Sequence, residues 1–226
     1  MEDLRNLDLD KIYKELTACK SEYMDNERYY IGDNTHIAER EPQRKPDNRV
    51  PTSFIRNLVD TMTGYAAKPG NIRQGFDDET TEQMDSQDSD FVRNMGYINE
   101  QNDEELYTAE QYEEVCLQGK SFEVFYTMPA EDGDDLSVVP YFIQVSKDNF
   151  YPVYSDRANK NLVGGIWYRM VGEDVLATVY DKEETTDYIK KKGGGTFSLA
   201  TYEDRENPLP NPYGIALCNE YTGNRR

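Results

Sequence analysis

Three consecutive residues, Gly119, Lys120 and Ser121, have the types that end a phosphate-binding loop. In that loop, the lysine side chain binds the phosphates and a hydroxyl side chain binds their metal ion. An earlier glycine helps the backbone approach the phosphates closely. The earlier glycine is required five residues before Gly119, where this chain has Glu114. The loop also leads from a strand into a helix, whereas the pattern here predicts a helix followed by a strand. We therefore interpret Gly119 as the C-cap of a helix and not as part of a nucleotide site.

The single histidine, His36, has no cysteine or second histidine beside it. A histidine-based metal site or a cysteine–histidine pair therefore lacks a local partner. The acidic run around Asp88 and Asp90 has neither the glycine nor the final glutamate of a calcium-binding EF-hand. A hydrolase with a pair of catalytic carboxylates stays open, although no two acidic residues are singled out. The sequence predicts a non-enzyme with no catalytic residue, no metal site and no cofactor.

Negative charge is concentrated in one segment of the chain. Residues 77–135 hold 19 acidic side chains against Arg93 and Lys120, a net charge of −17 out of the total of −19. This density repels phosphates and argues against a surface that grips nucleic acid there. A solvated acidic run and a protein that mimics DNA to block a nucleic-acid-binding enzyme both remain open.

The cysteines and the hydropathy exclude several classes of protein. Cys19, Cys116 and Cys218 lie far apart, so we expect no zinc ribbon and no disulfide scaffold, and a reducing cytoplasm is favoured. No apolar run reaches the length of about 18 residues that a membrane span needs. The acidic N-terminal residues do not have the pattern of a signal peptide.

Apolar periodicity divides the chain into a helical part at 1–120, with an acidic segment at 77–105, and a β part at 121–226. We expect them to form one unit. Steps of three and four residues predict helices at 10–30, from Pro51 to just before Lys68, around 91–99, and at 104–118. Alternation predicts strands at 121–127, 138–145, 150–154, 165–170, 175–180, 186–191, 197–202 and 215–221. The expected fold is α+β, with N-terminal helices followed by an antiparallel β meander.

The same periodicity predicts which helix faces are buried. The second helix should bury Phe54, Ile55, Leu58, Val59, Met62 and Tyr65. The helix at 104–118 should turn Leu106, Ala109, Cys116 and Leu117 inward.

One local cluster of basic residues precedes the second helix, formed by Arg40, Arg44, Lys45 and Arg49. A solvated loop, a contact with DNA and an ionic contact with a neighbouring subunit are all open. The subunit contact is the more economical functional hypothesis, because each copy would carry both the basic loop and the acidic segment.

Two stretches resemble the N-terminal half of portal proteins from tailed bacteriophages of the siphophage type. The first is YYIGD at 29–33 followed by His36-Ile37, and the second runs from KPDNRVP at 45–51 to VDTMTGY at 59–65. Looser similarity covers GKSFE at 119–123, residues 145–156 and residues 211–221, where Ala216 replaces an expected proline. The resemblance marks these residues as structural: Tyr30, Gly32, His36, Pro46, Asn48, Asp60, Thr61, Gly64, Tyr65 and Gly119.

The resemblance implies a structural virion protein of a capsid vertex that assembles in the host cytoplasm. Portal proteins of this family form twelve-fold rings, pass double-stranded DNA during packaging and ejection, and have no catalytic residues. Their partners are further copies of themselves, the terminase, head-completion proteins and capsid or scaffold proteins, with no membrane and no sequence-specific DNA binding. The matched portion resembles the wing, and we expect the chain to stop before the stem.

Overall fold

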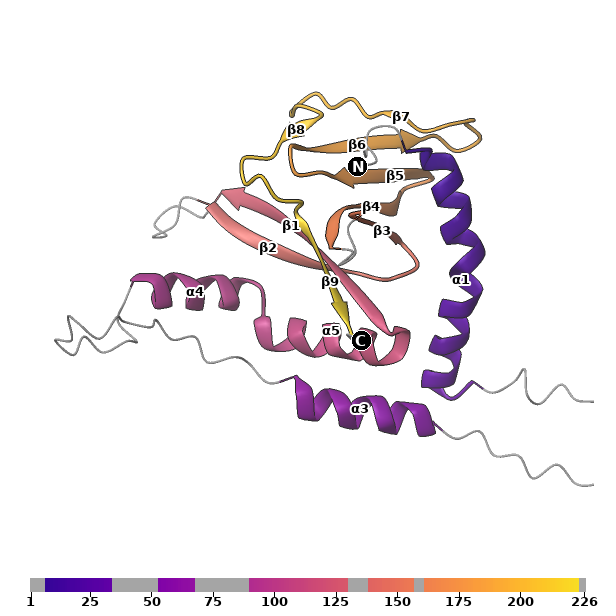
Figure 1. Cartoon of the computed structure of the whole chain (residues 1–226), viewed down its shortest axis with the longest axis vertical. Coiled ribbons are helices and arrows are strands. Elements are labelled where there is room, and N and C mark those ends of the chain that lie inside the picture. The colour runs from indigo at the N-terminus through magenta and orange to yellow at the C-terminus, as the bar shows by residue number, and fades with distance from the viewer. Residues whose placement is uncertain (1–6, 34–52, 68–89, 130–137, 157–160, 224–226) are drawn as a thin grey trace, which may run out of the picture.

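Helices come first along the chain and strands second in the computed structural model, which describes residues 7–33, 53–67, 90–129, 138–156 and 161–223 (Figure 1). The helices are α1 (Leu9–Ile31), α3 (Phe54–Ala66), α4 (Asp90–Gln101) and α5 (Glu104–Gln118). The strands are β1 (Lys120–Pro129), β2 (Val138–Val145), β3 (Phe150–Tyr154), β4 (Leu162–Val171), β5 (Asp174–Tyr180), β6 (Glu184–Lys190), β7 (Ser198–Leu199), β8 (Leu209–Pro210) and β9 (Cys218–Thr222). The α+β class and the antiparallel strands that the sequence predicts are confirmed.

The strands form two antiparallel sheets. In the second sheet β3 to β7 lie side by side in chain order, and β8 pairs with β6, which is the meander expected from the alternating pattern. The first sheet has the order β2, β1, β9. β9 returns from the second sheet to pair with β1, with Lys120 opposite Thr222 and Val124 opposite Cys218. The last strand thus links the two sheets.

Both ends of α1 are set by capping residues. Asp8 occupies the N-cap, and its carboxylate accepts a hydrogen bond of 3.0 Å from the backbone N–H of Lys11. Gly32 ends the helix in the left-handed conformation, with φ of 79°, and its N–H donates back to the last turn. The helix predicted at 10–30 is therefore confirmed.

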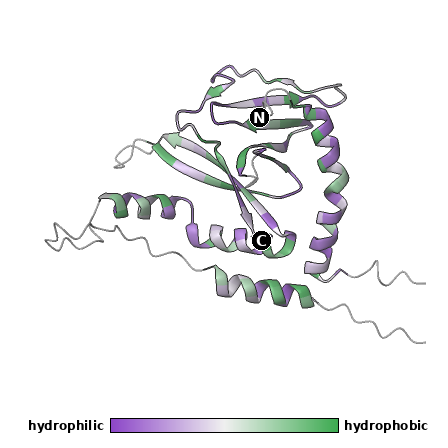
Figure 2. Ribbon diagram, in the orientation of Figure 1, coloured by the Kyte–Doolittle hydropathy of each residue, from purple (hydrophilic) through white to green (hydrophobic). Residues whose placement is uncertain are grey.

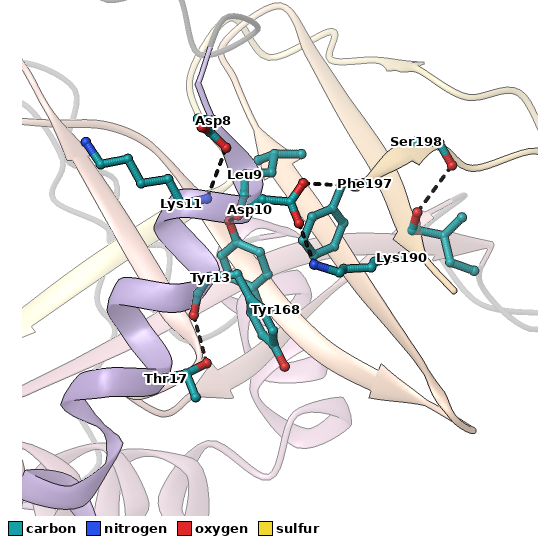
Figure 3. Close-up of polar contacts among 11 residues, drawn as sticks. Asp8, Leu9, Asp10, Lys11, Tyr13, Thr17, Tyr168, Lys190, Phe197 and Ser198 are labelled. Atoms are coloured by element: carbon teal, nitrogen blue, oxygen red, sulfur yellow. Dashed lines mark hydrogen bonds and ion pairs between the residues drawn. The ribbon is translucent and has the colours of Figure 1, made fainter. Parts of the chain in front are cut away.

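The first turns of α1 pack against the second sheet (Figure 3). Ile12 is buried in a core cluster with residues of β3, β4 and β5. The Tyr13 and Tyr168 rings lie 5.3 Å apart, and the Tyr168 hydroxyl donates to the backbone carbonyl of Leu9. Beside them the Lys190 ammonium lies 2.5 Å from the Asp10 carboxylate. These contacts tie the helical and strand-rich parts together.

A second core cluster lies between the two sheets. Phe122 of β1 stacks on Phe150 of β3 with ring centroids 4.6 Å apart, and both side chains are almost fully buried. Gly165 leaves room for this stack, because a Cβ there would lie 2.1 Å from the Phe150 ring. The inter-sheet packing therefore requires a glycine in β4.

Hydropathy varies strongly between the elements. Figure 2 shows apolar residues along the central strands and, in patches, on α3 and α4. Of the helices that the structure describes, none combines the length and the hydropathy needed to cross a bilayer.

Candidate assembly surface

The family-motif residues of α1 and α3 meet at a polar joint. The Tyr30 hydroxyl donates a hydrogen bond of 3.0 Å to the Asp60 carboxylate. Arg56 lies 3.6 Å from the same carboxylate and 5.8 Å from the centre of the Tyr30 ring. Burial raises the pKa of the Tyr30 hydroxyl, and the carboxylates of Asp60 and Glu113 raise it further. The structure therefore brings Tyr30 and Asp60 together and places both near α5.

Two motif glycines have backbone conformations that explain their residue type. At Gly32 the chain passes close to the start of α3, and an added Cβ would lie 2.6 Å from the Ser53 hydroxyl oxygen. Gly119 ends α5 with φ of 79°, which confirms the C-cap interpretation. Gly64 differs, because nothing lies within 4 Å of a Cβ built on it.

α3 packs differently from the sequence expectation. Its first described helical residue is Phe54, with Ser53 as the N-cap, and Pro51 lies outside the described residues. Thr61 donates a hydrogen bond of 2.6 Å to the carbonyl of Asn57 in the preceding turn. α3 lies on the outer side of α5 (Figure 1). One face of the helix is therefore left toward solvent.

The stripe predicted to be buried on α3 is mostly exposed, which corrects that expectation. Val59 is 3% exposed, but Phe54 is 79% and Tyr65 is 80% exposed. The exposed apolar residues are Phe54, Ile55, Leu58, Met62 and Tyr65, which we call the α3 apolar face. At 3.6 residues per turn these positions lie on one side of the helix. The prediction fails because periodicity shows which residues share a face and not which element covers it.

Seven of the predicted structural or contact residues lie outside the described ranges. They are His36, Arg40, Arg44, Lys45, Pro46, Asn48 and Arg49. The part of the acidic segment at 77–89 also lies outside them.

The buried face of α5 is polar. This corrects the expectation that the helix at 104–118 turns apolar residues inward. Gln111, Glu114 and Gln118 are its buried residues, whereas Leu106 is exposed. Gln118 accepts a hydrogen bond of 2.9 Å from Asn26 of α1. The i, i+3 and i+7 spacing places these polar residues on one helix face, and apolar periodicity does not detect such a face.

Glu123 of β1 is the centre of this polar interface. Its carboxylate accepts hydrogen bonds from Tyr107 of α5 at 2.7 Å and from Tyr221 of β9 at 2.8 Å. Asn219 donates a third at 3.1 Å. Gln111 donates to the Tyr107 hydroxyl at 2.8 Å and accepts from the Ser121 hydroxyl. This network holds α5 against β1 and β9, so its role is in positioning the helices.

Glu114 is a second buried acid on the same face of α5. Its side chain is 8% exposed, and Oε1 has no hydrogen-bond partner among the described residues. Burial raises the pKa of Glu114 to about 7, and the carboxylates of Glu27 and Asp148 add to the rise. The backbone N–H of Lys147 acts in the opposite direction. Burial therefore favours the protonated form of this acid more than water does.

The Gly119-Lys120-Ser121 run has the order that the sequence predicts, with helix α5 before it and strand β1 after it. The Lys120 ammonium lies 2.5 Å from the Glu220 carboxylate and 3.0 Å from the Tyr154 hydroxyl. These three side chains bond β1, β3 and β9 to one another. The lysine is thus occupied by structural contacts.

The described residues hold no group of histidine, cysteine, aspartate or glutamate side chains arranged to bind a metal ion. Cys19 is exposed, Cys116 is partly buried and Cys218 is buried, and all three are free thiols. Burial raises the pKa of the Cys116 and Cys218 thiols, which disfavours the reactive thiolate.

Comparison with known proteins adds one match to this geometry. A search of curated proteins found no match. A family model described as "Phage portal protein, SPP1 Gp6-like" matches residues 9–225, from the first turn of α1 to beyond β9. The matched span includes the α1–α3 joint, the α3 apolar face and the polar interface of α5. The chain therefore belongs to the SPP1 Gp6-like family of phage portal proteins.

Proposed function

We propose that this chain is a structural subunit of a phage portal ring at one capsid vertex, through which double-stranded DNA is packaged and ejected. The family match supports the portal role. The ring, the passage of DNA and assembly in the host cytoplasm are part of the proposal. Terminase, head-completion proteins and capsid or scaffold proteins are its proposed partners. We also propose that the chain does no enzymatic chemistry, since the lysine of its one phosphate-loop-like run is held by Glu220 and Tyr154.

The α3 apolar face is the observation that carries the assembly role. Five large apolar side chains lie on one side of a helix that packs outside α5. Leaving such a stripe in water costs free energy that burial in an interface recovers, at about 25 cal/mol per Å² of apolar surface. A contiguous apolar patch is also typical of a surface that contacts another protein. The proposed role is a contact within the assembled portal.

We also propose that the basic residues Arg40, Arg44, Lys45 and Arg49 make an ionic subunit contact. The strong negative charge at 77–135 supports this, because a neighbouring copy supplies acidic partners. We further propose that the helical part at 1–120 and the β part at 121–226 act as one wing-like unit. The ion pair between Asp10 and Lys190 and the contacts of Ile12 across the two parts support that unit.

The test uses two variants that add the same charge to the same helix. Leu58→Asp places a carboxylate inside the α3 apolar face, and Asn57→Asp places one outside it. Each variant is produced in cells that assemble phage heads, and the amount of chain that co-purifies with the heads is measured. We expect Leu58→Asp to lower that amount strongly and Asn57→Asp to leave it near the unmodified level. Equal incorporation of the two variants contradicts the assembly role of the face.

A further inference from the structure

The two sheets line a half-open cavity of about 460 Å³, and none of its lining residues belongs to α3. Its walls come from β1, β2, β4, β5, β6 and the segment at 205–209. This volume lies within the range of about 300–1,000 Å³ that is typical of ligand pockets. An adjoining groove of about 490 Å³ shares Phe125, Tyr126, Thr127 and Leu217 with the cavity. We call the two hollows together the inter-sheet crevice.

Arg169 lines the cavity without a carboxylate partner among the described residues. Its guanidinium lies over the Trp167 ring, 4.4 Å from the ring centre, and the side chain is partly buried. By contrast, Arg28, Arg56 and Arg205 each have a carboxylate within 4.0 Å. The guanidinium also shares a side-chain hydrogen bond with the Tyr180 hydroxyl, which lines the same cavity. A guanidinium has five N–H donors, so the others remain for a carboxylate, the partner that a partly buried arginine favours.

The acidic residues of the cavity do not neutralise Arg169. Asp187 is occupied by Arg205 at 2.7 Å, Thr178 at 2.6 Å and Tyr202 at 2.8 Å. Glu206 also lines the cavity, but the described contacts include no ion pair between it and Arg169. A single added carboxylate would thus meet one available guanidinium. A polyanion such as DNA is opposed by these two acids and by the net charge of −19.

The groove beside the cavity suits an extended apolar segment. None of the residues that line it is charged, and Val138, Pro140 and Ile215 are among them. β9 pairs with β1 up to Val124, and the Phe125 N–H then donates to the Leu217 carbonyl at 3.0 Å. Beyond that bond, β1 continues along the groove to Pro129. On that side no described strand continues the pairing, which is the geometry that receives an added strand.

We propose that the inter-sheet crevice binds an extended segment of a partner protein that carries a glutamate between apolar residues. The glutamate carboxylate binds the Arg169 guanidinium, and the neighbouring apolar side chains fill the uncharged groove. This site uses neither the α3 apolar face nor the basic residues of the portal assembly proposed above, so it stands or fails independently of them.

The sole tryptophan of the chain, Trp167, reports directly on this site. The probe is the capped tripeptide acetyl-Leu-Glu-Phe-amide, and the matched control is acetyl-Leu-Gln-Phe-amide. Each is titrated into the whole chain while tryptophan fluorescence is followed. We expect a saturable change with the glutamate peptide and a Kd about tenfold higher for the glutamine peptide, because one charge-assisted contact is lost. No saturable change with the glutamate peptide, or equal Kd values for the two, overturns the proposal.

Two variants in the cavity and one control variant outside it test which charges cause the preference for the glutamate peptide. Arg169→Gln should abolish the preference for the glutamate peptide, whereas Arg28→Gln, on α1 and away from the crevice, should keep it. Glu206→Gln removes a like charge from the cavity and should lower the Kd of the glutamate peptide a few-fold. Circular dichroism checks that each variant is folded. If Arg169→Gln does not fold, the Kd of the glutamate peptide for Glu206→Gln becomes the test. An unchanged or higher Kd in that variant contradicts the proposal.

Discussion

At the scale of single residues, the buried acids of the α5 interface are the least expected feature of the chain. Glu123 is satisfied by three donors from α5 and β9, whereas Oε1 of Glu114 has none among the described residues. A buried carboxylate without enough donors is more easily accommodated in its protonated form. Glu114 should therefore make the stability of the fold depend on pH near neutrality.

The sign of that dependence follows from the raised pKa. The pKa of Glu114 is about 7 in the folded protein and 4.5 in its ordinary state, so the folded protein binds the proton more tightly. The resulting stability is fully present below the ordinary pKa and is lost as the pH rises through about 7. Glu114→Gln should remove this loss, so the variant should melt at a higher temperature than the unmodified chain at about pH 8.

The matched control for this measurement is Glu110→Gln, which makes the same change on the exposed side of α5. Melting temperatures of the three proteins are compared between about pH 5 and about pH 8. A Glu114→Gln variant whose melting temperature follows the unmodified chain at every pH contradicts the assignment.

The hydrogen bond from Tyr107 to Glu123 gives a second prediction at this scale. Tyr107→Phe removes a donor from a buried carboxylate and an acceptor from Gln111. We expect a loss of about 1–3 kcal/mol in the free energy of unfolding, measured by urea denaturation. Tyr112→Phe, at an exposed position of the same helix, should change it by less than about 0.5 kcal/mol. A similar change in the two variants argues against a structural network at Glu123.

At the scale of elements, the joint between α1 and α3 depends on the conformation of Gly32. A Cβ there meets the Ser53 side chain, and φ of 79° disfavours any residue other than glycine. Gly32→Ala should therefore lower the free energy of unfolding by about 1 kcal/mol. Gly64→Ala is the matched control, because Gly64 lies within α3 with open space around its Cβ position. It should raise stability by about 0.5–1 kcal/mol. Thermal unfolding measures both, and a stabilising Gly32→Ala contradicts the described joint.

The sequence predicts most elements of this fold and few of their contacts. The strands Val138–Val145 and Phe150–Tyr154 have the bounds predicted from apolar alternation, and α5 has its predicted bounds as well. The pairing of β9 with β1 was not predicted, because alternation gives no information about a partner so distant in the chain. The short strand β8 lacks an alternating pattern altogether.

At the candidate site too, the sequence identifies residues but predicts few of their contacts. The resemblance to portal proteins marked Tyr30 and Asp60, and the structure joins them by a hydrogen bond. It marked Tyr65 too, but that side chain is exposed and lies on the α3 apolar face. The sequence does not distinguish Arg169 from other arginines, because its significance depends on the lack of a carboxylate partner among the described residues in three dimensions.

At the scale of the whole molecule, net charge and exposed apolar surface have opposite effects on association between chains. A net charge of −19 makes identical chains repel one another, and the repulsion weakens with salt. The α3 apolar face favours association, and salt does not weaken this apolar contribution by screening. An assembly that buries this face should therefore be strengthened by salt, whereas one held mainly by ionic contacts should be weakened.

The proposed portal role requires the chain to occupy a single vertex of the phage head. Heads from producing cells are labelled with a gold-conjugated antibody against the chain and viewed by electron microscopy, with unrelated antibody as the control. We predict label at a single vertex of each head. Labels spread over the head surface, or heads that lack the chain altogether while it remains free in the lysate, contradict the portal role.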